Sequence, residues 1–400
     1  MSGRGAGPLA GVTVLDLTSV LMGPYATQIF ADLGADVVKI ESPSGDTTRY
    51  IPPGPDADRG AMFLNVNRGK RSLGLNLKTE EARAALLRLA AKADVFVHTM
   101  RSQAIARLGL DYAALKAANP RIIYCNMYGY GRKGPYRDHP AYDDIVQAAS
   151  GIVDLQASLS GGEPTYVANV IADKVAGLTG AYAVMAALYA REKTGEGQEI
   201  EVPMFETMVS FCATEHLCGS LFDPPLGPPH YPRATSEARR PYRTADGYVG
   251  VMIYNDKHWR NFFRELGDPD WSKDPIFQSM RTRTENIGTV LSRVAEVLET
   301  RRTAEWLDIF RRAEIPATAI ASLTELLDDE HLREVGFWER RVTPMGTLRF
   351  PGIPTSFSET PGAIGDPGPA LGADNDALLR EAGYTDTEID KLRSKGAITG

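Results

Sequence analysis

The 400-residue sequence has very little cysteine, and the few cysteines are not arranged in pairs. Only Cys125, Cys212 and Cys218 occur, and no two of them form a C-x-x-C motif. A zinc knuckle or a disulfide framework needs such pairs, so we expect neither. This cysteine usage favours a reducing compartment.

The sequence also lacks the features of a targeting or membrane segment. Residues 1–8 are short and glycine-rich, without the apolar stretch of a signal peptide. The longest apolar run, around residues 181–190, is too short and too alanine-rich to span a bilayer. We therefore expect a cytoplasmic protein with no membrane partner.

Positive charge is not in excess. Lys and Arg total 44 against 51 Asp and Glu, which gives a net charge of −7. A nucleic-acid-binding protein needs a basic face, so we expect no nucleic-acid partner, although local basic pockets remain open.

Several common catalytic and cofactor-binding motifs are missing. No G-x-G-x-x-G follows the first predicted strand, and neither a phosphate-binding G-x-x-x-x-G-K-[ST] nor a G-x-S-x-G occurs. The six histidines form no H-E-x-x-H or other close cluster. These absences argue against a classical dinucleotide site, a Ser-His-Asp hydrolase and a metal centre.

What the sequence does contain is an alternation of strand and helix patterns over its first half. Strands are predicted at 12–17, 36–40, 94–97, 122–125 and 198–202, with helices at 23–33, 79–89, 172–190 and 205–217. Thr79 is the expected N-cap of the second helix, and Gly34 is expected to end the first. This alternation predicts an α/β fold, with a parallel sheet covered by helices on both faces.

The composition changes at a proline-rich stretch, residues 223–229. Beyond it, Asp-Gly at 246–247 between β-forming residues predicts a hairpin, and helices are expected at 259–266, 290–298 and 304–312. We therefore divide the chain into a large domain (residues 1–222), a smaller α+β domain with linkers (223–325) and a C-terminal return to the large domain (326–400).

A series of short segments occurs in a fixed order along the chain. They are Gly-Pro at 23–24, Asp-Leu-Gly-Ala-Asp at 32–36, Asn-Arg-Gly-Lys-Arg at 67–71, Arg-Leu-Gly at 107–109, Tyr-Asp at 142–143 and Arg-Glu-Lys-Thr-Gly-Glu-Gly-Gln at 191–198. Their order resembles that of the class III coenzyme A transferase family, which includes carnitine, formyl and bile-acid CoA transferases and α-methylacyl-CoA racemase. The resemblance is dense over residues 8–215 and thinner through 241–248 and the C-terminal tail.

The resemblance implies that Asp173 is the nucleophile, because it lies at the start of the long helix that ends in the 191–198 segment. A carboxylate near a helix N-terminus is stabilised by the positive end of the helix dipole, so we expect Asp173 to be ionised. It would attack a thioester and form first an aspartyl anhydride and then an aspartyl-CoA thioester. The alternative is that Asp173 is only the N-cap of this helix.

The racemase branch of the family resembles Gly-His-Asp where this sequence has Ala141-Tyr142-Asp143. The histidine is a proton-transfer group in that branch, and Tyr142, with an ordinary pKa near 10, is a poor base at neutral pH. CoA transfer is therefore favoured over racemisation. A racemase or epimerase, and a non-catalytic CoA-binding protein, remain the alternatives.

The resemblance also implies a set of CoA-binding residues. CoA carries phosphates and an adenine, which require cations, helix N-termini and apolar walls. The candidates are Val20, Leu21, Met22, Arg49, Arg71, Thr99, Met100, Arg101, Arg107 and Tyr142. CoA is expected as a substrate in acyl-CoA form, with no permanently bound cofactor and no metal.

Relatives that act on formate or oxalate carry a run of glycines before the small domain. Here that region contains Arg233, Arg239 and Arg240 instead, which suggests a bulkier acceptor with a second carboxylate. The equal alternative is that these arginines face water or a partner subunit. The resemblance further implies a Rossmann-like large domain and an interlocked homodimer.

Overall fold

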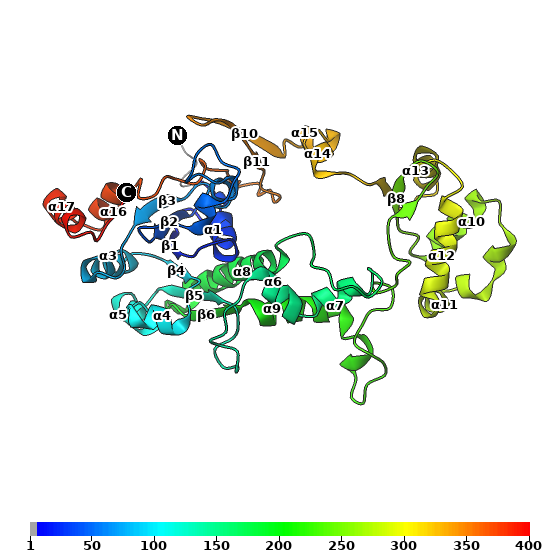
Figure 1. The fold of residues 1–400 in the computed structure, drawn as a ribbon, viewed down its shortest axis with the longest axis horizontal. Helices are drawn as coiled ribbons and strands as arrows, with labels where there is room; N and C mark the ends of the chain where they lie inside the picture. The colour runs from blue at the N-terminus through cyan, green and yellow to red at the C-terminus, as the bar shows by residue number, and fades with distance from the viewer. Residues whose placement is uncertain (1–5) are drawn as a thin grey trace. The chain divides into compact units, whose positions relative to one another are not determined.

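The computed structural model describes residues 6–400, which divide into two compact units. Unit 1 comprises the residues up to Ser150, Ala168–Phe211 and His331–Gly400. Unit 2 comprises Gly151–Val167 and Cys212–Glu330. The chain therefore leaves unit 1 and returns to it near its C-terminus (Figure 1).

Unit 1 is built on a six-stranded sheet in which every pair of neighbouring strands is parallel, as the sequence predicts. The strand order is β3-β2-β1-β4-β5-β6. The strands are β1 (Thr13–Leu17), β2 (Asp36–Glu41), β3 (Arg71–Gly74), β4 (Val95–His98), β5 (Ile123–Tyr128) and β6 (Glu199–Pro203). The order reverses between β1 and β4, and such a switch point is where open α/β sheets bind ligands.

Side chains of alternate residues along each strand enter different layers. Leu15 and Leu17 of β1 belong to a core formed with α3 (Glu80–Ala90), α4 (Ser102–Arg107), α5 (Tyr112–Ala118), α16 (Asn375–Glu381) and α17 (Asp386–Ser394). Asp16 of β1 instead bonds to Thr27 on α1 (Met22–Asp32). The predicted caps are confirmed: Thr79 accepts a hydrogen bond from the backbone of Ala82, and Gly34 has a φ of +97° after α1.

The long helix α8 (Ile171–Thr194) packs against α1 and β5. Glycines on α8 allow this close approach: a Cβ at Gly177 would lie 2.8 Å from the carbonyl oxygen of Met22, and one at Gly180 would lie 2.6 Å from Cε of Met127. The helix predicted at 172–190 is thus observed. It runs for 24 residues, which is longer than the predicted 172–190.

By length and composition alone, α8 is also apolar enough to cross a membrane, with a mean hydropathy of 1.3 over its best window. The expectation that no segment is long enough to span a bilayer is therefore wrong. Half of that window is buried inside the structure, however, and the core helix of a globular protein has the same composition.

The remaining elements of unit 1 connect these layers. They are η1 (Thr47–Tyr50), α2 (Ala61–Val66), α6 (Asp143–Ala149), a hairpin of β10 (Trp338–Thr343) and β11 (Gly346–Pro351), and most of α9 (Met204–His216). Strand β3 and helix α17 are not among the elements predicted from the sequence. Helix α15 (Glu330–Glu334) begins where the chain re-enters unit 1.

Unit 2 has its own aromatic core around a three-stranded sheet. The predicted Asp-Gly hairpin is confirmed, since β7 (Tyr242–Arg243) pairs antiparallel with β8 (Tyr248–Val251), which also pairs with β9 (Ala317–Ala319). Its helices and turns are α7 (Ile152–Ala157), η2 (Cys218–Leu221), α10 (Asp256–Glu265), η3 (Asp270–Lys273), η4 (Pro275–Phe277), α11 (Met280–Glu285), α12 (Ile287–Leu298), α13 (Thr303–Arg312) and α14 (Leu323–Leu326).

Candidate active site

Two cavities of unit 1 are lined by the residues that follow the carboxyl ends of the sheet strands. The aspartate cavity has a volume of about 290 Å³ and is lined by Ser19, Val20, Met22, Thr99, Arg101, Met127, Tyr128, Gly129, His139, Pro140, Ala141, Tyr142, Asp173 and Met204. The large cavity, about 790 Å³, is lined by residues 17–20, 40–47 and 75–78 together with Met100, Leu108 and Tyr142. Their position agrees with the switch point between β1 and β4.

Three residues line both cavities: Ser19, Val20 and Tyr142. Ser19 and Val20 lie between β1 and α1, and Tyr142 is the N-cap of α6. We call these three residues the junction. The side chain of Tyr142 is 69% exposed, so it is free to contact a ligand that extends from one cavity to the other.

Asp173 lies in the first turn of α8, and only 7% of it is exposed. Its backbone N–H donates to Oδ1 of Asp143 over 2.9 Å, while Oδ2 of Asp143 accepts from Nε2 of Gln147 over 2.5 Å. Burial raises the pKa of Asp173, and repulsion from the Asp143 carboxylate adds to this, which brings the pKa to about 7. Two buried aspartates are therefore neighbours, and the carboxylate of Asp143 accepts the backbone N–H of Asp173.

Two expectations about Asp173 need correction. It is not the N-cap of the helix, because α8 begins at Ile171 and Val170 is at the cap position. The expectation that the helix dipole keeps it fully ionised is also wrong, since burial and Asp143 outweigh the dipole. At neutral pH the group is close to its midpoint, which is the range in which a carboxyl group exchanges protons and attacks as an anion.

Many of the predicted CoA-binding residues lie together at these cavities. Val20, Met22, Thr99, Arg101 and Tyr142 line the aspartate cavity, and Met100 lines the large one. Arg107 lies beside them, lining a third space of about 390 Å³ together with Met100 and Arg101. Leu21, by contrast, is buried and lines neither of the two cavities.

Arg49 and Arg71 are also predicted CoA-binding residues, and the structure places them elsewhere. Arg49 is 1% exposed, forms a bidentate pair with Glu41 and stacks on the ring of Phe63 at 3.8 Å. Arg71 is held between Asp36 and Glu381. Neither lines the two cavities, because each guanidinium is already committed to carboxylates.

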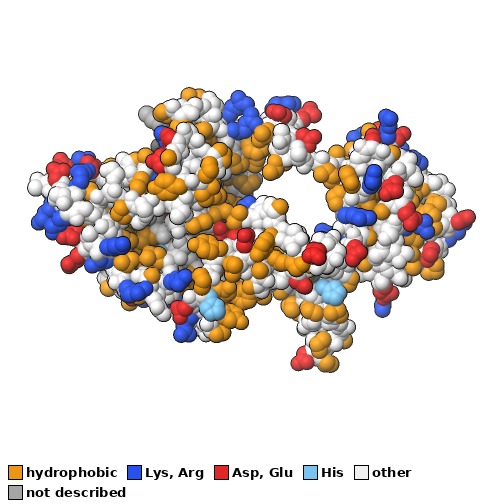
Figure 2. Space-filling model, viewed as in Figure 1, with side chains coloured by type: hydrophobic (Ala, Val, Ile, Leu, Met, Phe, Trp, Pro, Cys, Tyr) orange, Lys and Arg blue, Asp and Glu red, His pale blue; other side chains and the backbone are white. Residues whose placement is uncertain are grey.

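Arg101 and Arg107 are different, because both are exposed. Within residues 6–400 neither forms an ion pair, so their charges are available for a phosphate. Lys78, which lines the large cavity, is a third exposed cation that was not among the predicted ligands. Figure 2 shows that acidic and basic side chains are interspersed over the visible face of the molecule.

The three arginines predicted to bind the acceptor lie in unit 2. Arg233 lines a small cavity of about 200 Å³ with Tyr231, Tyr254, Trp259 and Arg283, and its guanidinium is 6.0 Å from the ring centre of Tyr254. Arg239 and Arg240 are exposed and are not among the residues that line this cavity. The structure therefore separates Arg233 from the other two.

Some residues of the site were missed by the sequence analysis. They include Ser19, Pro43, Ser44, Lys78, Tyr128 and Met204, and also Asp143, whose side chain adjoins Asp173. Most of them directly follow a strand, so the carboxyl ends of the predicted strands were the signal that could have found them.

Comparison with known proteins decides the family of this chain. The model of CoA-transferase family III matches residues 9–375. The chain belongs to CoA-transferase family III. It is therefore an enzyme of the class III CoA-transferases, as the resemblance in the sequence indicates.

Individual relatives agree with this assignment. The chain is 32% identical to the succinyl-CoA:mesaconate CoA-transferase of Haloarcula marismortui, with 97% of this chain and 99% of the relative covered. It is 34% identical to the acetyl-CoA:oxalate CoA-transferase of Acetobacter aceti, with 94% and 96% covered. Among solved structures, Rv3272 of M. tuberculosis superposes with a TM-score of 0.82 at 29% identity, covering 94% of this chain and all of that one.

Proposed function

We propose that this CoA-transferase moves CoA from an acyl-CoA to a carboxylic acid through covalent catalysis by Asp173. The observation that carries the proposal is the placement of Asp173: a carboxyl group with a pKa raised to about 7 lines a cavity at the switch point of the sheet. Strongly shifted carboxyl groups in clefts are typical of catalytic residues. The family membership supplies the reaction class.

The reaction proceeds in balanced steps. The Asp173 carboxylate attacks the thioester carbonyl, a C–O bond forms, the C–S bond breaks and CoA thiolate leaves, which gives a mixed anhydride. The thiolate then attacks the aspartyl carbonyl, releasing the donor acid and leaving an aspartyl-CoA thioester. The acceptor carboxylate attacks this thioester and expels the thiolate, which finally takes the acceptor acyl group and frees Asp173.

The surroundings of Asp173 favour this chemistry. Burial and the neighbouring Asp143 disfavour a second negative charge, which is why the pKa of Asp173 is raised. An acylated aspartyl side chain is neutral, like the protonated one. The same two effects therefore favour the acyl-enzyme states over the free carboxylate and make that carboxylate more reactive.

For CoA itself we propose the large cavity. Its volume of about 790 Å³ lies in the usual range of ligand sites, and it adjoins the aspartate cavity at the junction. The exposed cations Lys78, Arg101 and Arg107 are proposed as the phosphate ligands. CoA is then a substrate that enters and leaves, with no permanently bound cofactor.

For the acceptor we propose a dicarboxylate. Mesaconate, named for one relative, is a dicarboxylate that is bulkier than oxalate. An arginine forms bidentate bonds to a carboxylate, and Arg233, unlike Arg239 and Arg240, is set among aromatic side chains in a cavity. Arg233 is therefore the strongest candidate for binding the distal carboxylate.

We also propose that two copies of the chain form the interlocked homodimer that the resemblance implies. Residues 223–325 form the smaller domain in this proposal, and the protein is located in the cytoplasm. Exposed apolar side chains on α8 and α9 support a partner surface: Leu178, Tyr182, Tyr189, Val209 and Phe211. Hydrophobic side chains gather over this part of unit 1 in Figure 2. Light scattering should give a dimer that does not dissociate on dilution, because interlocked chains separate only by unfolding.

The test is a panel of acyl-CoA donors and carboxylic acids, with products read by mass spectrometry, for the wild type and Asp173→Asn. The wild type should transfer CoA to at least one acceptor, while Asp173→Asn should lose about 10³-fold or more in kcat, because the amide is not a nucleophile. Hydroxylamine added with an acyl-CoA should modify the peptide that contains Asp173. An active Asp173→Asn enzyme would contradict the mechanism.

The same panel tests acceptor choice with Arg233→Ala, and with Arg239→Ala as the matched control. Loss of a charge-assisted contact costs about 1.5–3 kcal/mol, so kcat/KM should fall roughly one to two decades for dicarboxylates only. Equal changes for mono- and dicarboxylates would show that Arg233 has a structural role.

A further inference from the structure

Val20, one of the three junction residues, has an unfavourable backbone conformation. Its φ is +69°, in the left-handed region that glycine adopts freely and that a β-branched residue strongly disfavours. Val20 lines both the aspartate cavity and the large cavity. A strained residue at this position persists only if the surrounding structure holds it.

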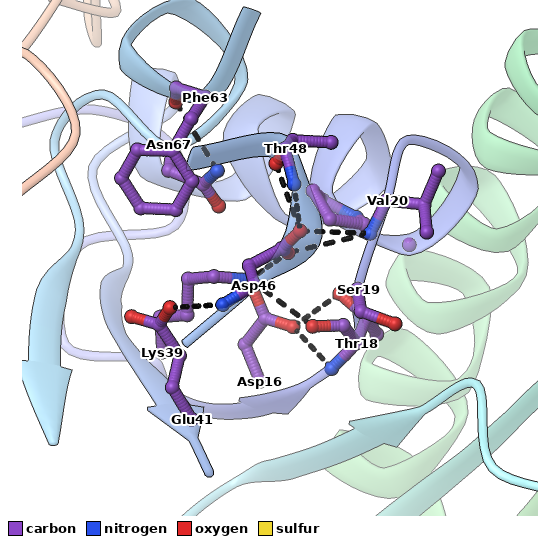
Figure 3. Close-up of polar contacts among 12 residues, drawn as sticks. Asp16, Thr18, Ser19, Val20, Lys39, Glu41, Asp46, Thr48, Phe63 and Asn67 are labelled. Atoms are coloured by element: carbon purple, nitrogen blue, oxygen red, sulfur yellow. Dashed lines mark hydrogen bonds and ion pairs between the residues drawn. The ribbon is translucent and has the colours of Figure 1, made fainter. Parts of the chain in front are cut away.

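A buried ion pair holds it. The backbone N–H of Val20 donates to both carboxylate oxygens of Asp46, at 3.3 Å each. Nζ of Lys39 donates to Oδ2 of Asp46 over 2.9 Å and to the carbonyl oxygen of Thr18 over 3.0 Å. The Lys39–Asp46 pair thus holds the chain on both sides of Ser19 (Figure 3). The side chain of Lys39 is 0% exposed and that of Asp46 is 1% exposed.

The pair is itself fixed by further contacts. Oδ1 of Asp46 accepts from the backbone N–H and the hydroxyl of Thr48, and the backbone N–H of Asp46 donates to Oε1 of Glu41. Glu41 is held in turn by the bidentate contact from Arg49. This accounts for the buried position of Arg49, whose charge supports Glu41.

We propose that the Lys39–Asp46 pair is a positioning device for the transfer reaction. It holds Val20 in its left-handed conformation, so that the wall between the two cavities directs the thioester of a bound acyl-CoA toward Asp173. This inference rests on the proposed function, which places CoA in the large cavity. Lys39 lines neither cavity. Asp46 borders the large cavity, but its side chain is only 1% exposed, so the pair acts through Val20 and does not touch the reacting atoms.

The first experiment removes the pair without leaving an unpaired buried charge, using Lys39→Met with Asp46→Leu. Misplacing the thioester should lower kcat by about 10- to 100-fold, with a change in the KM for acyl-CoA of less than about threefold. The matched control is Asp32→Leu with Arg68→Met, which removes another buried pair of the same unit, with side-chain exposures of 6% and 3%. The control should leave kcat within about threefold.

Rescue separates positioning from a general structural effect. Adding Val20→Gly to the pair-deletion variant should restore most of the lost kcat, because glycine adopts a positive φ without support. Adding Val20→Ala should not restore kcat. Alanine and glycine both lack the two γ-methyl groups of valine, but alanine keeps the Cβ that disfavours a positive φ. Equal loss in the control variant, or no difference between glycine and alanine, overturns the proposal.

A third measurement does not depend on activity or on the folding of the pair-deletion variant. In the otherwise unchanged protein, Val20→Gly should unfold at a higher temperature than Val20→Ala, the reverse of the usual order, because only glycine relieves the left-handed strain. A higher unfolding temperature for Val20→Ala overturns the proposal. If instead the wild type transfers no CoA in the substrate panel, the proposed function fails while this ordering still reports on the strain.

Discussion

Asp16 and Asp173 are two buried carboxyl groups of unit 1, and their environments drive their pKa values in opposite directions. Burial alone would raise the pKa of Asp16, but Lys70 and Lys39, with hydroxyl donors from Thr18 and Thr27, lower it to about 2. Burial raises the pKa of Asp173 to about 7, and its charged neighbour is the carboxylate of Asp143. Both groups are buried, so the sign of the neighbouring charge decides the direction in which each pKa moves.

The Asp16 environment is saturated. Its Oδ2 accepts from Nζ of Lys70 over 3.0 Å and from the hydroxyl of Thr27 over 2.6 Å, and its Oδ1 accepts from the backbone of Thr18 over 2.9 Å. For Asp173, neither a cation nor a hydroxyl donor lowers the pKa. The first carboxylate is stabilised as an anion, and the second is destabilised as one.

The largest effect on stability is expected where the saturated site is broken. Asp16→Asn leaves the fully buried Lys70 without its counter-charge, so the free energy of unfolding should fall by about 3–5 kcal/mol. Chemical denaturation at pH 7 measures this, with Asp56→Asn, at the exposed pair with Arg59, as a control that should change little. A loss below about 1 kcal/mol for Asp16→Asn would remove the contrast between the two carboxylates.

Substitution of Asp173, in contrast, is expected to raise the free energy of unfolding at neutral and higher pH. Its folded pKa of about 7 lies above the ordinary value of 3.8, so the folded state loses stability as the pH rises from about 4 to 7. Asp173→Asn removes this loss. The stability of this variant relative to the wild type should therefore be about 2.6 kcal/mol greater at pH 8 than at pH 5. Unfolding curves at the two pH values test this, and a pH-independent difference would contradict the raised pKa.

The smallest effect is expected on the pH dependence of activity when Asp143, the neighbour of Asp173, is substituted. Asp143→Asn removes the repulsion that contributes to the raised pKa of Asp173, so the acid limb of the kcat/KM profile should move to lower pH. The exposed Asp144, one residue further along α6, provides the control as Asp144→Asn. If the two variants give the same profile, burial alone sets the pKa of Asp173.

The sheet was predictable because buried parallel strands are short apolar runs. The five predicted strands correspond to β1, β2, β4, β5 and β6. Strand β3 was missed because Arg-Ser-Leu-Gly carries no such pattern, and its outer side is completed by residues about 300 positions away, as in the bond from Ser72 to Asp374. Sequence patterns report local periodicity, and this strand depends on a distant segment.

The site was predictable in position but not in electrostatics. The resemblance placed Asp173 at the start of α8, but its protonation depends on burial and on Asp143, 30 residues earlier. For the same reason Arg71 resembled a phosphate ligand in the sequence. Its partner Glu381 lies 310 residues further along, so the pairing is visible only in the folded chain.

The late return of the chain to unit 1 has a consequence for how the protein is made. The backbone N–H groups of Ser72 and Gly74 bond to Asp374 and Asn375, and Leu75 forms a bridge with Ile398. At a synthesis rate of about 5–20 residues per second, the β3 edge waits on the order of 15–60 s for these partners. Residues 212–330 have meanwhile left the ribosome, so the bulk of unit 2 is available to fold first. Until residues 374–398 are made, the β3 edge of the sheet presents unpaired backbone groups to which another strand can pair.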